Sequence, residues 1–155
     1  MLALFIAGLA LIGPSGENDW TIVTVARNNL MAVDRTTVVR RGDEVLFWVI
    51  YAPVTSETTD DGLSYDYQVQ RWEGDCARST FKIVSNSMFE LSGRLVDMRP
   101  VDMPLFPATP DSEAGDILET VCSGEWGYLP PLRTARDVAR LSQSPDGEIS
   151  ALRAR

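Results

Sequence analysis

Residues 44–52 read EVLFWVIYA, and this stretch decides the fold class. It is rich in β-branched and aromatic residues and is apolar on both faces, which is typical of a strand buried in the middle of a sheet. Gly42 and Asp43 form a turn signal before it, and Pro53 ends it. The stretch therefore predicts a central strand around which the rest of the sheet is built.

Short apolar or alternating segments on both sides of this strand predict further strands. Their expected ranges are 20–25, 30–34, 38–41, 63–72, 79–84, 88–91 and 94–98. Residues 35–37 are expected to turn between two of them, and Ser92-Gly93 is expected to close a hairpin. Residues 55–62 form a polar loop in which Asp60 and Asp61 are expected to be solvated. Short strands joined by brief turns favour an antiparallel meander.

The pattern changes after a connection punctuated by prolines. Residues 111–122 (DSEAGDILETVC) have the period of a helix, with one apolar stripe made of Ala114, Ile117, Leu118, Val121 and Cys122. The sequence therefore predicts an α+β fold. We expect a small antiparallel β-sheet meander packed against a C-terminal helix.

The chain has two cysteines, Cys76 and Cys122, and no CxxC motif. In an oxidising compartment the two would form a disulfide, which would staple the predicted helix to the end of a strand. The alternative is a pair of buried free thiols. No catalytic dithiol chemistry is expected.

Residues 1–15 (MLALFIAGLALIGPS) carry no charge. The apolar run at 2–12 is too short to span a bilayer and matches the hydrophobic region of a secretory signal peptide, with a mature chain from about Gly16. A buried first strand or helix is the alternative. We therefore expect a signal peptide over 1–15, export, and no stable membrane span.

The folded domain is expected over 16–124, followed by a linker, a short helix and a mobile tail over 125–155. Thr134-Ala135-Arg136-Asp137 is a capping-box pattern that opens the short helix. The end of the chain lacks apolar periodicity. Arg133, Arg136 and Arg140 lie close to one side of this helix, and a solvated face is the favoured interpretation. The segment after residue 124 therefore resembles an appendage to the domain.

Composition excludes several function classes. The formal net charge is −8, which argues against a nucleic-acid partner. The chain has no histidine, so a histidine base or a histidine-ligated metal is excluded. No nucleophile motif or glycine-rich phosphate loop is present. We expect no enzyme activity, no catalytic residue, no metal site and no cofactor.

Aromatic residues on the predicted strands are the main candidates for binding. Tyr65 and Tyr67 alternate onto one face of the segment 63–72, with Gln68 and Gln70 on the other. If exposed, the two tyrosines would form a contact surface, because tyrosine is enriched at interfaces. The alternative, which strand-located aromatics favour, is that they belong to the core.

The order of landmarks along residues 20–123 resembles the surface-adhesin protein E-like domains of Gram-negative bacteria. The landmarks are Trp20, Val33-Asp34, Arg41-Gly42-Asp43, Phe47-Trp48, Asp75-Cys76, Phe81, Gly93, Pro110-Asp111-Ser112 and Val121-Cys122. The resemblance implies a small antiparallel sheet packed against a helix held by the disulfide. It also implies an exported protein, with some relatives acting as adhesins that bind host matrix proteins.

The sequence and this resemblance lead to one expected function and two alternatives. We expect an exported, non-enzymatic binding protein, in the periplasm or at the cell surface. The residues do not identify its protein partner, and a host extracellular matrix protein is the candidate that the resemblance implies. The first alternative is a periplasmic, envelope-associated structural or interaction module without a host ligand, which could form a homodimer through a sheet edge. The second is a small-molecule binder with a pocket between helix and sheet.

Overall fold

The computed structural model describes residues 18–144. The expected signal peptide and the expected mobile tail beyond residue 144 lie outside the described residues. Within residues 18–144, no helix is both long enough and apolar enough to cross a membrane.

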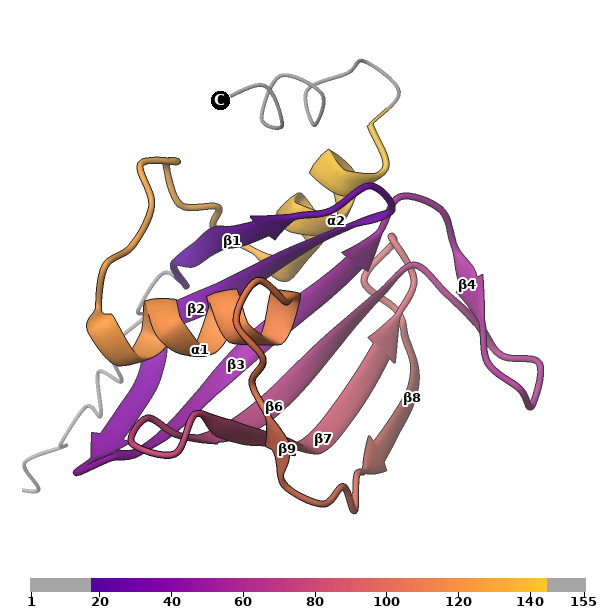
Figure 1. The fold of residues 1–155 in the computed structure, drawn as a ribbon. Coiled ribbons are helices and arrows are strands. Elements are labelled where there is room, and N and C mark those ends of the chain that lie inside the picture. Colours follow the sequence, from indigo (N-terminus) through magenta and orange to yellow (C-terminus); the bar gives the residue numbers. More distant parts are fainter. Residues whose placement is uncertain (1–17, 145–155) are drawn as a thin grey trace, which may run out of the picture.

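The described chain forms a seven-stranded antiparallel sheet that curls into a half-barrel (Figure 1). The strand order is β1-β2-β3-β6-β7-β8, and β9 pairs with the far end of β7. The strands are β1 (Trp20–Val25), β2 (Asn29–Arg41), β3 (Glu44–Pro53), β6 (Tyr67–Asp75), β7 (Thr80–Phe89), β8 (Leu95–Pro100) and β9 (Phe106–Pro107). A separate hairpin of β4 (Glu57–Thr58) and β5 (Ser64–Tyr65) projects beside the sheet. The expected α+β fold with an antiparallel meander is confirmed.

Strand β3 lies in the middle of the sheet, between β2 and β6, as its composition predicts. Phe47 and Val49 point to one face and Ile50 points to the other, and all three are fully buried. Because successive side chains of a strand alternate between faces, a strand that is apolar throughout needs cover on both sides. The sheet therefore requires two covering elements.

The expected turn at residues 35–37 is wrong, because β2 runs through it as one strand. The pairing with β3 is irregular between Asp34 and Val39. The Asp34 carboxylate accepts hydrogen bonds from the Thr36 backbone N–H at 3.1 Å and the Thr36 hydroxyl at 2.7 Å. The small polar residues at 35–37 suggested a turn, but their local hydrogen bonds form a bulge within the strand instead.

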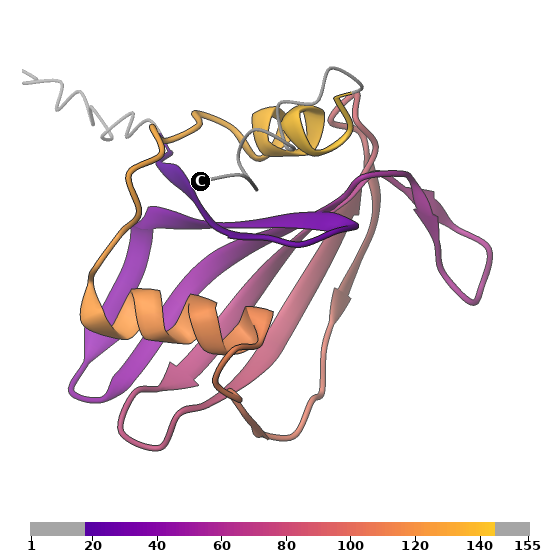
Figure 2. The same ribbon diagram turned by 45° about the horizontal axis from the view of Figure 1, so that its top comes forward.

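The two helices cover opposite faces of the sheet (Figure 2). Helix α1 (Glu113–Ser123) buries Ile117, Leu118 and Val121 in one core cluster, together with Phe47 of β3. Its N-cap is Ser112, whose hydroxyl accepts a hydrogen bond from the Gly115 N–H, so the helix begins two residues later than expected.

Helix α2 (Ala135–Ser142) packs on the other face of the sheet. The segment after residue 124 was expected to be an appendage, and this packing corrects that expectation. Val138 and Ala139 are fully buried in the second core cluster, beside Ile50. The linker that precedes α2 is also attached, because the backbones of Trp20 and Leu132 exchange hydrogen bonds at 3.0 and 2.9 Å. The described part of the segment after residue 124 is thus integrated into the fold.

Polar contacts fix the end of α2 against the sheet. The buried Ser142 hydroxyl donates to the Ala52 carbonyl oxygen of β3 at 2.6 Å. The Gln143 side chain donates to the Asp66 carbonyl oxygen at 3.2 Å. At the start of the helix, Thr134 and Asp137 form the predicted capping box.

Cys76 and Cys122 form the expected disulfide, with their Cα atoms 5.7 Å apart and their positions 46 apart in the sequence. The alternative of two free thiols is therefore wrong. The bond joins the residue after β6 to the last turn of α1. It covalently links the helix to the sheet that it covers.

Candidate functional site

A row of polar side chains crosses the α1-side face of the sheet beyond the helix. The pairing register places Gln70 of β6, Asn86 of β7 and Arg99 of β8 side by side. Gln68 of β6 and Asp97 of β8 lie two residues along their strands from Gln70 and Arg99, on the same face. We call these five residues the polar row. Helix α1 lies over the β1–β3 side of the same face, so the row occupies the part of the face that the helix leaves open (Figure 1).

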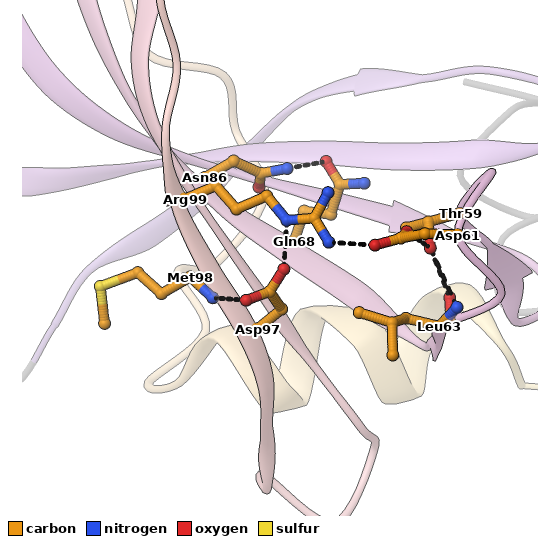
Figure 3. Close-up of polar contacts among 8 residues, drawn as sticks. All are labelled: Thr59, Asp61, Leu63, Gln68, Asn86, Asp97, Met98 and Arg99. Carbon is orange, nitrogen blue, oxygen red and sulfur yellow. Dashed lines mark hydrogen bonds and ion pairs between the residues drawn. The ribbon is translucent and has the colours of Figure 1, made fainter.

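The amides of the polar row are held in place by each other. The Trp72 indole N–H donates to Gln70 Oε1 at 2.9 Å, and Gln70 Nε2 donates to Gln68 Oε1 at 2.8 Å. Asn86 Nδ2 donates to the same Gln68 oxygen at 3.1 Å, as Figure 3 shows. Asn86 Oδ1 is buried and has no hydrogen-bond partner among the described residues. The row therefore presents amide groups in fixed orientations.

The β4–β5 arm is anchored at its base by a carboxylate between two tyrosines. Glu57 of β4 accepts hydrogen bonds from the Tyr51 hydroxyl at 2.8 Å and the Tyr65 hydroxyl at 2.5 Å. Burial raises the pKa of both hydroxyls well above its usual range, and the hydrogen bond to Glu57 raises it further. Both tyrosines therefore stay protonated and act as donors at neutral pH.

The tip of the arm meets the polar row through an ion pair, shown in Figure 3. Arg99 Nη2 donates to Asp61 Oδ2 at 2.6 Å, and Arg99 Nε donates to Asp97. Hydrogen bonds from the Thr59 hydroxyl and from Arg99 hold the pKa of Asp61 below its usual range. All three charged groups are accessible to water, so these pairs position the arm more than they stabilise the fold.

The two tyrosines singled out in the sequence lie in different places. Tyr65 is 7% exposed and belongs to the base of the arm, and Tyr67 is 4% exposed in the core beneath α2, stacked on Phe89. The expected alternation breaks between them at Asp66, whose carboxylate accepts a hydrogen bond from the Leu91 N–H at 2.5 Å. Tyr67 is thus packed in a core cluster, whereas Tyr65 is buried at the base of the arm, outside both core clusters.

The chemistry available at this site is hydrogen bonding. Throughout residues 18–144, no group of three histidine, cysteine, aspartate or glutamate side chains lies close enough to hold a metal ion. The polar row instead offers amide, guanidinium and carboxylate groups on one open face. These groups recognise polar ligands by direct hydrogen bonds.

The fold and site together define a disulfide-linked α+β domain with an open face suited to binding. The chain belongs to the surface-adhesin protein E family, whose model matches residues 20–123. No curated protein matches the chain. The family match confirms the resemblance read from the sequence and gives an adhesin-like binding protein. It ends at the last residue of α1, so α2 lies outside the matched region.

Proposed function

We propose that the protein is an exported, non-enzymatic adhesin that binds a host extracellular matrix protein through the polar row. The observation that carries this proposal is the row itself, in which side chains from three neighbouring strands are held in fixed orientations on an open face. Fixed donors and acceptors lose little conformational entropy when a partner binds. Membership of the adhesin family supports the same function.

The geometry suits an extended segment of a protein partner. Strand β8 is the outermost strand on this side of the described sheet, so its outer backbone groups can pair with an added strand. Its side chains Asp97 and Arg99 form the end of the polar row beside that edge. A bound segment would place its backbone along β8 and its polar side chains beside Asp97 and Arg99, at the outer end of the polar row.

The binding experiment uses the purified full-length mature protein and immobilised laminin, fibronectin and collagen. We expect saturable binding to at least one of them, weakened by Arg99→Gln and by Gln70→Ala. Arg140→Gln, which changes an exposed arginine on α2 at a distance from the row, is the matched control and should bind like the wild type. Absence of binding to all three proteins, or equal loss in the control, would contradict the proposal.

A second experiment separates the adhesin from the envelope-associated module. A tagged form is treated with protease on intact cells and on cells with a permeabilised outer membrane. Cleavage on intact cells supports surface display and adhesion. Cleavage after permeabilisation alone would place the protein in the periplasm, and the module without a host ligand would then replace the adhesin as its function.

A further inference from the structure

A cavity of about 510 Å³ lies on the face of the sheet opposite to the polar row. It is lined by residues of β2, β3, β6 and β7 and by Leu105, which precedes β9. The pairing register places Leu46, Glu73 and Lys82 in one row of this face. Helix α2 packs at the opposite end of the same face, near Ala52, so the described helices do not cover the cavity.

Most of the residues that line the cavity are charged, but Val39, Leu46 and Leu105 add an apolar part to the lining. Val39 and Leu46 are direct partners across β2 and β3, and both line it. Val39 is 49% exposed and Leu105 is 60% exposed, which are large values for aliphatic side chains. An apolar group that covers these three residues would remove their surface from water, which is favourable.

Some of the charged side chains that line the cavity form ion pairs with each other, and others do not. Lys82 pairs with Glu73 at 2.8 Å, and Arg78 lies 3.8 Å from Asp75. Two further arginines and Glu44 line the cavity without an ion pair in the described structure. Arg41 is the direct cross-strand partner of Glu44.

Arg71 is different, because its cross-strand partners Trp48 and Ser85 carry no charge. It is exposed and lines the cavity without an ion pair among the described residues, and Glu73, the carboxylate two residues along the same strand, pairs with Lys82 instead. Arg71 therefore offers a guanidinium without an ion pair in the same cavity as Val39, Leu46 and Leu105.

We propose that this cavity binds a small amphipathic carboxylate, with the carboxylate on Arg71 and the hydrocarbon chain over Val39, Leu46 and Leu105. A guanidinium can bind a carboxylate through two parallel hydrogen bonds. The volume lies within the range of about 300–1,000 Å³ that is common for small-molecule sites. Glu44, Glu73 and Asp75 at the rim disfavour a ligand with several negative charges. The site lies on a different face from the polar row, so it does not depend on the proposed adhesin function.

The test is a titration of the full-length mature protein with octanoate and with 1-octanol, followed by amide chemical shifts. We expect octanoate to shift the resonances of Leu46, Arg71 and Leu105 in a saturable way. Arg71→Gln should weaken octanoate binding about fivefold, the loss expected for one exposed ion pair. It should leave the binding of 1-octanol, which has no charge, unchanged.

Two further variants make the test specific. Arg140→Gln removes an exposed arginine elsewhere and should bind octanoate like the wild type, whereas Leu105→Ser should weaken both ligands. All three substituted residues are exposed, so an unchanged spectrum away from the cavity verifies the fold. The proposal is overturned if octanoate shifts no cavity residue, if Arg71→Gln and Arg140→Gln behave alike, or if Arg71→Gln weakens both ligands equally.

Discussion

Helices α1 and α2 cover opposite faces of the same sheet, but they are fastened to it in different ways. Helix α1 inserts Ile117, Leu118 and Val121 and is tied covalently through Cys122. Helix α2 buries the small pair Val138 and Ala139 and is fixed by hydrogen bonds, such as that from Ser142 to β3. One helix is therefore held by a large apolar contact and a covalent bond, and the other by a small contact with precise polar partners.

The difference coincides with the limit of the family match. Helix α1 lies within residues 20–123, whereas α2 follows them. The face that α2 covers includes Leu30 and Ile50, which are fully buried. The matched region alone would leave these side chains without the cover that α2 gives them. In this chain, the sheet within the family match is therefore covered on its second face by a helix outside that match.

The largest expected effect comes from removing the covalent tie. The double variant Cys76→Ser/Cys122→Ser should lose about 4 kcal/mol of free energy of unfolding, because the disulfide closes a long loop in the unfolded chain. Urea denaturation measures this loss. Hydrogen exchange should accelerate more in α1 than in α2, since only α1 is tied by the bond. Equal acceleration in both helices would contradict the comparison.

Core substitutions compare the two helices without touching the disulfide. Ile117→Ala in α1 should lower the free energy of unfolding by about 3 kcal/mol, because it removes buried carbon atoms and leaves a cavity. Val138→Ala in α2 removes fewer atoms and should cost about 2 kcal/mol. Chemical denaturation of both variants is the measurement. A Val138→Ala variant as stable as the wild type would show that α2 is only an appendage.

The smallest expected effect is a difference in alkaline stability between the two faces. The pKa of Tyr51, on the α1 side, is raised by burial and by Glu57, with a further contribution from Glu113 of α1. Burial also raises the pKa of Tyr67 beneath α2, but Arg136 of α2 opposes that shift. A raised pKa means that the folded state keeps its proton while the unfolded state loses it above pH about 10, so stability falls as pH rises.

The measurement is the free energy of unfolding of the wild type, Tyr51→Phe and Tyr67→Phe between pH 8 and pH 10.5. This range is set by the ordinary tyrosine pKa of about 10. Tyr51→Phe should make the alkaline decline less steep than in the wild type. Tyr67→Phe should change the slope less, because Arg136 has already reduced the shift there. Identical slopes for the wild type and Tyr51→Phe would refute the claim that the raised pKa of Tyr51 contributes to the alkaline decline.

The sequence predicted the packing of α1 but not that of α2, and the reason is the size of their apolar residues. The residues Ile117, Leu118 and Val121 form a clear stripe at helical spacing. Helix α2 was predicted from its capping box, and its apolar face consists of Ala135, Val138, Ala139 and Leu141, of which two are alanines. Its remaining attachment uses polar atoms and a bridge from Leu132 to Trp20, which local sequence patterns do not reveal.

Part of the candidate site could be predicted from the sequence. Alternation along β6 placed Gln68 and Gln70 on one face, and the structure extends that face into the polar row. The pairing of Asp61 with Arg99 joins residues 38 positions apart. No local signal distinguishes Asp61 from a solvated loop residue, because its partner is set by how the arm lies beside β8. Long-range pairing of this kind depends on the complete fold.

The disulfide also limits how far the chain can be stretched. If the described chain is pulled from its two ends, α2 and the linker can be drawn away, but the interval from Cys76 to Cys122 stays closed. An extended chain spans about 3.3–3.6 Å per residue, so the disulfide keeps about 150 Å of chain, the interval of 46 residues, from extending when the ends are pulled. Strands β7, β8 and β9 and helix α1 lie within that interval. Under tension, the outer strand of the polar row is therefore kept within a covalently closed loop.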